Sequence, residues 1–135
     1  GVCLARGEAA QLFVPGNHGS TFGGNPLACA TAHAVLDVIE EENICSQAKI
    51  QGQRVVDGLR TALAGNNSVT EVRGLGMMIA VELNNEVPSL VSDALSDGLL
   101  INVTQGNIVR LLPPLNLSNE EADELVSKLA TLLNR

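Results

Sequence analysis

The sequence predicts an α+β fold, in which a small and mostly antiparallel sheet carries helices on one of its faces. From about residue 46 onward the chain alternates helix-like and strand-like runs: a helix, a strand region, a helix, a strand pair and a final helix. Apolar residues make up 45% of the 135 residues, which is enough for a core. Aromatic residues make up only 1%, so that core must be aliphatic.

The first 45 residues do not fit that domain comfortably. Residues 1–5 are apolar and predict a short buried strand. Because no polar residues precede this strand, we expect the chain to be a piece of a longer protein. Residues 6–24 predict a long loop, and loops beyond roughly 12–15 residues are usually functional or disordered. Its few charges argue against disorder. We therefore divide the chain into residues 1–45, the end of a different domain that includes a bridging helix, and residues 46–135.

Helices are predicted from end signals and apolar spacing. Asn25 suits the N-cap, and Pro26 the first position, of a helix that continues over residues 27–42. A second helix is predicted over residues 46–64, with Gly65 as its C-cap. Its expected apolar stripe consists of Ile50, Val56, Leu59 and Leu63.

Two further helices are predicted toward the end of the chain. Pro88 begins a short helix that ends near Gly98. Ser118 and Glu121 have the spacing of a capping box at the start of the last helix. The apolar face of that helix consists of Leu125, Val126, Leu129, Leu132 and Leu133.

The strands are predicted between these helices. Residues 69–83 ("VTEVRGLGMMIAVEL") predict two strand segments joined by a glycine kink or bulge, with Met77 and Met78 in the core. Residues 99–104 and 108–112 predict a hairpin that turns at Gln-Gly-Asn, and the Pro-Pro pair that follows ends its second strand.

Composition and charge exclude several kinds of partner. The net charge of −7 argues against nucleic acid or an anionic membrane surface, because both are bound by basic faces. No apolar run approaches the roughly 18–20 residues of a membrane span. Cys3, Cys29 and Cys45 are odd in number and widely spaced, which favours reduced thiols in a cytoplasm. The absence of a CxxC or HxxxH pairing in the sequence argues against a bound metal.

The stretch "GSTFGGNP" has features of a phosphate or carboxylate site. Ser20 and Thr21 offer hydroxyl donors, and Gly23 and Gly24 allow a ligand to approach the backbone closely. The helix that begins at Pro26 directs the positive end of its dipole toward this loop. From these residues alone, a structural glycine-rich turn and a binding loop both remain open.

Four segments in order carry a resemblance to a known family. The segments are "HGSTFGGNPLACATAHAVLDVIE", "VRGLGMMIAVEL", "GLLINVTQGNIVRLLPPL" and "LSNEEADELVSKL", which are distributed between residues 18 and 129. They resemble class III pyridoxal-phosphate aminotransferases of the ornithine type, the acetylornithine branch above all. The resemblance implies the small C-terminal domain of a fold-type I pyridoxal-phosphate transferase over residues 46–135. It implies the end of the large cofactor-binding α/β domain over residues 1–45.

The resemblance also implies site residues. Thr21 would donate to the phosphate of pyridoxal 5'-phosphate across a homodimer interface, and Ser20 would line the substrate pocket. Arg110 would hold the α-carboxylate of the amino or keto acid, which suits a guanidinium fork. The lysine that forms a Schiff base with the cofactor would lie upstream, and Lys49 and Lys128 match no family motif. No catalytic residue is therefore assigned, and we expect the 135-residue chain alone to be inactive.

Several readings remain open beside this one. The parent enzyme is expected to transfer the side-chain amino group of N-acetylornithine to 2-oxoglutarate in arginine biosynthesis, in the cytoplasm. Succinylornithine, ornithine and 4-aminobutyrate aminotransferases are close alternatives. A different class of function is a stand-alone, non-catalytic domain that interacts through helix packing.

Overall fold

The computed structural model describes residues 4–17 and 19–135. The chain forms two compact units, Gly1–Asp37 and Val38–Arg135, and the division between them lies inside helix α1. The boundary predicted near residue 45 marks the end of a different domain and stays a prediction.

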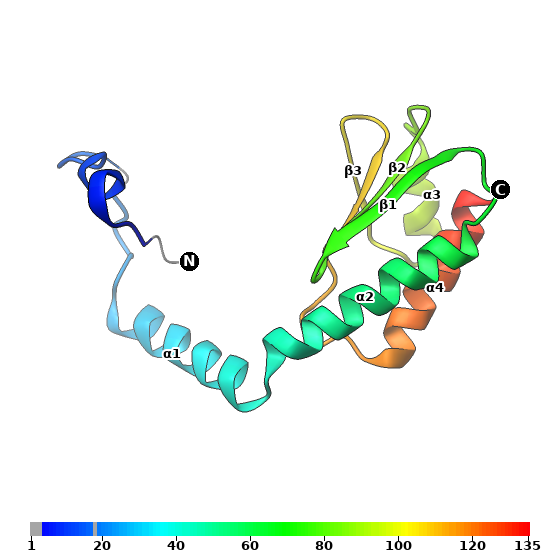
Figure 1. Ribbon diagram of the computed structural model, residues 1–135. Helices are drawn as coiled ribbons and strands as arrows, with labels where there is room; N and C mark the ends of the chain where they lie inside the picture. The colour runs from blue at the N-terminus through cyan, green and yellow to red at the C-terminus, as the bar shows by residue number, and fades with distance from the viewer. Residues whose placement is uncertain (1–3, 18) are drawn as a thin grey trace. The chain divides into compact units, whose positions relative to one another are not determined.

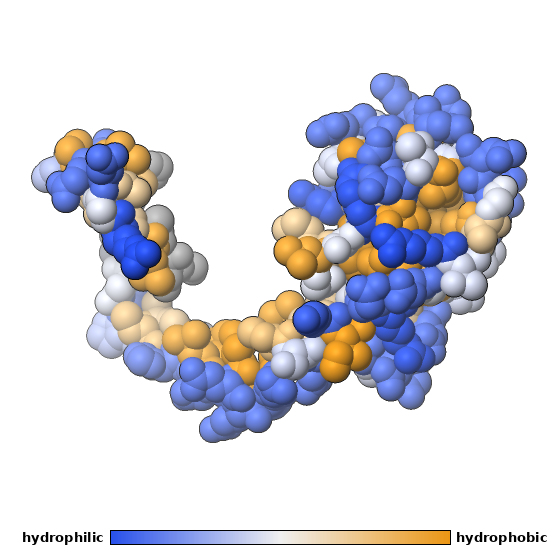
Figure 2. Space-filling view, in the orientation of Figure 1, coloured by the Kyte–Doolittle hydropathy of each residue, from blue (hydrophilic) through white to orange (hydrophobic). Residues whose placement is uncertain are grey.

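The first unit contains a 3-10 helix, Gly7–Gln11, and most of helix α1, Pro26–Glu41. The predicted helix start is confirmed, because the Oδ1 atom of Asn25 accepts a hydrogen bond from the backbone N–H of Ala28 at 3.0 Å. Helix α1 buries none of its residues, and apolar side chains gather along it on the surface shown in Figure 2.

The strand predicted over residues 1–5 is absent from the two of these residues that the structure describes. Residues 1–3 lie outside the described residues, whereas Leu4 and Ala5 have no strand conformation and are exposed. An apolar strand needs neighbouring strands to pair with its backbone and cover its side chains. In the described part of the first unit no strand is present to do so.

The second unit holds a four-stranded antiparallel sheet with the strand order β1-β2-β4-β3. The strands are β1, Val69–Leu75; β2, Met78–Leu83; β3, Asn102–Thr104; and β4, Ile108–Leu111. The helices are α2, Ile44–Ala62; α3, Leu90–Ser96; and α4, Asn119–Leu133. Helices α2 and α4 cover one face of the sheet in Figure 1, which confirms the predicted α+β class.

An aliphatic core fills the space between this sheet face and the helices. The largest fully buried side chains are Val55, Leu59, Ile79, Val81, Val109 and Leu129. The stripe predicted for the second helix is correct at Val56, Leu59 and Leu63 but wrong at Ile50, which is 66% exposed. Residues 44, 48, 52, 55, 56 and 59 form the buried face of α2, and position 50 falls on the opposite side at helical spacing.

The segment predicted as two strands joined by a kink or bulge is a hairpin. Leu75 pairs with Met78, and Gly76 and Met77 form a two-residue turn in which Gly76 has a φ of 54°. The irregularity in this pair of strands lies elsewhere, between Val69 and Glu71. Met77 is buried as predicted, but Met78 is 64% exposed, because alternation along β2 directs it to the uncovered face.

The remaining elements agree with the sequence-based predictions in type and order. The hairpin of β3 and β4 turns at residues 105–107, where Gln105 and Gly106 both have positive φ. The capping box of α4 is present: Glu121 Oε2 accepts from the Ser118 N–H at 2.9 Å, and Ser118 Oγ accepts from the Glu121 N–H at 3.2 Å. Helix α2 ends slightly earlier than expected, with Leu63 rather than Gly65 at its C-cap.

The edge strand β1 accepts hydrogen bonds at its backbone from a side chain of helix α2. The guanidinium of Arg60, from α2, donates to the carbonyl oxygen of Val72 from Nε at 3.1 Å and from Nη2 at 2.9 Å. This contact ties the helix layer to β1.

Candidate functional site

The loop that precedes α1 is shaped by its own side chains. The Oγ atom of Ser20 accepts a hydrogen bond from the N–H of Gly23 at 3.1 Å. The side-chain amide of Asn25 donates to the carbonyl of Phe22, and its oxygen caps α1. These short-range bonds set the turn that leads into the helix, and Gly24 adopts a φ of 74° within it.

The hydroxyl of Thr21 is free to donate in this turn. Thr21 is exposed, and within the described residues its hydroxyl makes no hydrogen bond. The hydroxyl of Ser20 accepts from the Gly23 N–H and keeps its own O–H as a donor. A free hydroxyl beside flexible glycines at a helix N-terminus is a donor set that suits a phosphate. His18, which also belongs to the motif, lies outside the described residues.

Arg110 lies on the face of the sheet that the helices do not cover. Its neighbours in β4, Val109 and Leu111, are buried in the core, so alternation directs Arg110 to the opposite face. In register, Arg110 is opposite Ala80 of β2. Ala80 in turn is opposite Arg73 of β1. The small Ala80 therefore separates two arginines whose Cα atoms are about two strand spacings, roughly 10 Å, apart.

These residues line an open hollow of about 460 Å³ on the uncovered face. Its walls are mainly apolar, and its charged groups are the two arginines. The lining residues are Arg73, Gly74, Leu75, Met78, Ile79, Ala80, Thr104, Ile108 and Arg110. A mostly apolar hollow with a few cationic groups suits a small molecule that carries a carboxylate.

The two arginines of this hollow differ in their partners. The Nη1 atom of Arg73 is 2.6 Å from a carboxylate oxygen of Glu71 and 2.6 Å from one of Glu82. The hydrogen bond to Glu82, followed by that to Glu71, raises the pKa of Arg73. Arg110 makes no ion pair with any residue that the structure describes. Its guanidinium is therefore the one in the hollow that is open to an anionic ligand.

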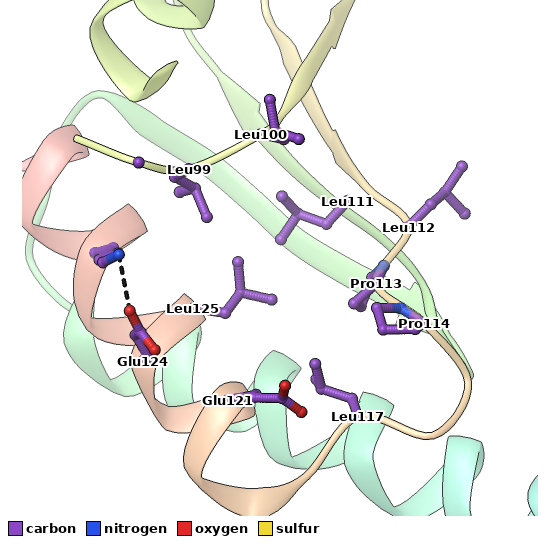
Figure 3. Close-up of a pocket in the computed structure, with 12 residues that line it drawn as sticks. Leu99, Leu100, Leu111, Leu112, Pro113, Pro114, Leu117, Glu121, Glu124 and Leu125 are labelled. Carbon is purple, nitrogen blue, oxygen red and sulfur yellow. Dashed lines mark ion pairs between the residues drawn. The ribbon is translucent and has the colours of Figure 1, made fainter. Parts of the chain in front are cut away.

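A second hollow, of about 450 Å³, lies between α4 and the segments that flank β3 and β4, as Figure 3 shows. Its walls are leucines and prolines, and none of the predicted site residues lines it. Its polar groups are occupied, since Glu121 belongs to the capping box and Glu124 is 2.7 Å from Lys128. This hollow offers no free charged group to a ligand.

The predicted site residues are divided between the two units. Ser20 and Thr21 are adjacent in the first unit, and Arg110 belongs to the second. Sequence reasoning assigned no role to Arg73, which forms ion pairs with Glu71 and Glu82. It did not foresee that Arg73 and Ala80 share a row with Arg110. Strand alternation could have placed Arg73 on the uncovered face, but only the strand register brings the three residues together.

Comparison with known proteins places the chain in a family. Residues 2–133 match the class-III aminotransferase family. The chain is 49% identical over its whole length to acetylornithine aminotransferase 1 of Bordetella pertussis and covers 34% of that protein. The chain thus spans about a third of the length of the curated relatives that it matches.

Solved structures agree with this match. The acetylornithine aminotransferase of Elizabethkingia anophelis superimposes with a TM-score of 0.79 at 35% identity, over 93% of this chain and 34% of that one. The Toxoplasma gondii ornithine aminotransferase, in a structure described as having partial occupancy of PLP at the active site, gives a TM-score of 0.81 at 34% identity. That match covers 96% of this chain and 32% of the other. The chain therefore belongs to the class-III aminotransferase family.

Proposed function

We propose that this chain supplies the carboxylate-binding and phosphate-binding groups of an acetylornithine-type aminotransferase. The observation that carries the proposal is the open guanidinium of Arg110 in an apolar hollow on the uncovered sheet face. The reaction is the transfer of the side-chain amino group of N-acetylornithine to 2-oxoglutarate, a step of arginine biosynthesis in the cytoplasm. Ornithine aminotransferase is the nearest alternative, because relatives with that name also match the chain.

In this proposal Arg110 orients the substrate. The keto acid, 2-oxoglutarate, carries a carboxylate next to its reacting carbon. The amino donor, N-acetylornithine, carries its carboxylate at the end of the molecule opposite to the reacting amino group. A guanidinium holds a carboxylate through two parallel N–H bonds and stays charged at all working pH values. Arg110 is exposed, so its charge is accessible to a ligand carboxylate from solution. Arg110 therefore fixes the position of the substrate and discriminates against amines that lack a carboxylate.

Thr21 serves the cofactor. Class-III aminotransferases use pyridoxal 5'-phosphate, which when bound supplies the electron sink for amino transfer. The free hydroxyl of Thr21 donates to its phosphate, and the N-terminus of α1 favours the negative charge. Ser20 borders the substrate. We place this phosphate in the site of a second subunit of a homodimer, so that the loop completes the neighbouring site.

The amine that attaches the cofactor is not supplied by these 135 residues. Lys128 forms an ion pair with Glu124 at 2.7 Å, and Lys49 lies on α2 beside the hairpin turn, so both lysines have surface positions. We expect the purified chain to show no transaminase turnover, with or without added pyridoxal phosphate.

A chimeric enzyme tests the proposal. This chain replaces the matching segment of the Bordetella pertussis relative, and transfer from N-acetylornithine, N-succinylornithine and ornithine to 2-oxoglutarate is measured. We expect turnover, with N-acetylornithine preferred. Arg110→Gln is expected to lower kcat/KM by at least about 100-fold through loss of a charge-assisted bidentate contact. Thr21→Val is expected to weaken cofactor binding while leaving the substrate KM nearly unchanged.

Two results would reject the proposal. An active chimera in which Arg110→Gln retains its kcat/KM would remove the carboxylate role. Unchanged cofactor affinity in Thr21→Val, with Ser127→Ala as a matched hydroxyl deletion on the surface of α4, would remove the phosphate role.

A further inference from the structure

The uncovered sheet face carries two carboxylates that share one arginine, Arg73. Glu71 and Glu82 lie directly opposite each other on β1 and β2. Opposed residues on one face of an antiparallel pair have Cβ atoms about 4.5–5.5 Å apart, and like charges in that position are destabilising. Arg73 resolves the conflict by placing one Nη1 atom 2.6 Å from each carboxylate.

Glu82 also lies within reach of Arg110. Ala80 is the direct partner of Arg110 in the register of β2 and β4, and Glu82 is two residues further along the same face of β2. Diagonal neighbours of this kind are about 7–8 Å apart, a distance that a Glu and an Arg side chain together span easily. The Glu82 side chain is only 33% exposed, and an unpaired charge that is largely removed from water costs free energy. Without Arg73, pairing with the nearest cation would lower that cost.

We propose that Arg73 is a positioning residue, which holds the Glu82 carboxylate away from Arg110 and so keeps Arg110 open to a ligand carboxylate. This inference rests on the proposed role of Arg110 and adds to it. The four charged residues of the face sum to zero with Arg73 present. Without Arg73 the face carries a net negative charge, and Glu82 pairs with Arg110 as an internal competitor of the substrate.

The position of Glu82 tests this role without reference to activity. Crystal structures of the chain carrying Arg73→Gln are expected to show the Glu82 carboxylate within 4 Å of the Arg110 guanidinium. The Nε–Hε resonance of Arg110 in nuclear magnetic resonance spectra is expected to shift in the same variant. In the double variant Arg73→Gln/Glu82→Gln, this resonance is expected to return to its position in the unmodified chain. Arg110 remaining unpaired in Arg73→Gln, with an unshifted resonance, would overturn the inference.

Ligand binding gives a second readout. Glutarate, a five-carbon dicarboxylate, is titrated into each variant of the chain. An exposed ion pair is worth roughly 0.2–1 kcal/mol, so competition from Glu82 is expected to weaken glutarate binding about 1.4- to fivefold in Arg73→Gln. Arg73→Lys, which keeps the charge, and the double variant are both expected to recover most of the affinity. Failure of the double variant to recover would assign Arg73 a merely structural role and overturn the inference.

The two proposals fail in different ways. Absence of glutarate binding in the unmodified chain and in the chimera counts against Arg110 as a carboxylate site. The location of Glu82 in Arg73→Gln decides the role of Arg73 independently of that result.

Discussion

Gly52 of α2 lies against the carbonyl group of Gly76 in the turn between β1 and β2, so closely that a Cβ atom on Gly52 would be 2.0 Å from the Gly76 oxygen. No side chain fits at that position, and the obstacle is backbone, which cannot rotate away. A residue that costs helix stability is therefore required where the helix crosses the hairpin turn.

The first prediction concerns this contact. Gly52→Ala is expected to lower the free energy of unfolding by about 1–3 kcal/mol or more, because the helix and the turn must separate. Gly58→Ala, in the same helix, is the matched control. The atoms nearest to a Cβ there belong to the Val126 side chain, at 3.0 Å, and a side chain can shift, so we expect a much smaller change. Urea denaturation measures both, and equal effects would contradict the prediction.

The second prediction concerns the start of α4. Ser118→Ala removes the side chain that accepts from the Glu121 N–H and leaves that donor without its partner. We expect a loss of about 1 kcal/mol in the free energy of unfolding. Ser127→Ala, mid-helix and exposed, is expected to change stability very little. Thermal denaturation of both variants checks the difference.

The third prediction concerns the stability of the fold at low pH. The Ser118 backbone N–H, together with its hydroxyl, lowers the pKa of Glu121, and the hydrogen bond from Arg54 lowers that of Asp123. Groups with a lowered folded-state pKa stabilise the protein above their unfolded-state pKa and lose that contribution as the pH falls through the folded-state pKa. We expect the free energy of unfolding to decline as the pH falls below about 5.

Variants identify the carboxylates responsible. Glu121→Gln and Asp123→Asn are each expected to be less stable than the unmodified chain at neutral pH and to converge with it in acid. Denaturation series at fixed ionic strength measure this. Differences that persist unchanged at low pH would contradict the assignment.

The fourth prediction concerns the hollow beside Arg110. Ala80→Leu is expected to weaken glutarate binding several-fold by filling the space between Arg73 and Arg110, since Ala80 lines that hollow. Stability is expected to change by less than about 1 kcal/mol, because the residue faces away from the core. Ala64→Leu, the same substitution at an exposed residue outside this hollow, is the control. Calorimetric titration is the measurement.

Local signals explain which parts of the fold were predictable. The capping box at Ser118 and Glu121 and the turn at residues 105–107 depend on side chains a few positions apart, and both were found as expected. Residues 69–83 were harder, because two glycines are compatible with a kink or a tight turn. Only the pairing of Leu75 with Met78 distinguishes these.

The site was predictable to a similar degree. Arg110 and Thr21 were assigned through family motifs, and their roles stay predictions. The ion pair of Arg73 with Glu82 joins residues nine positions apart whose contact depends on the hairpin register. Because a one-residue slip would exchange the two faces, composition and spacing could not identify it.

The contact between Arg60 and the Val72 carbonyl has a consequence for self-assembly. Arg60 occupies a backbone acceptor of β1 that would otherwise be available to an intruding strand. An incoming chain would have to expel a charged group that already makes two hydrogen bonds there. The Arg60 guanidinium therefore opposes the pairing of a strand from another molecule with β1.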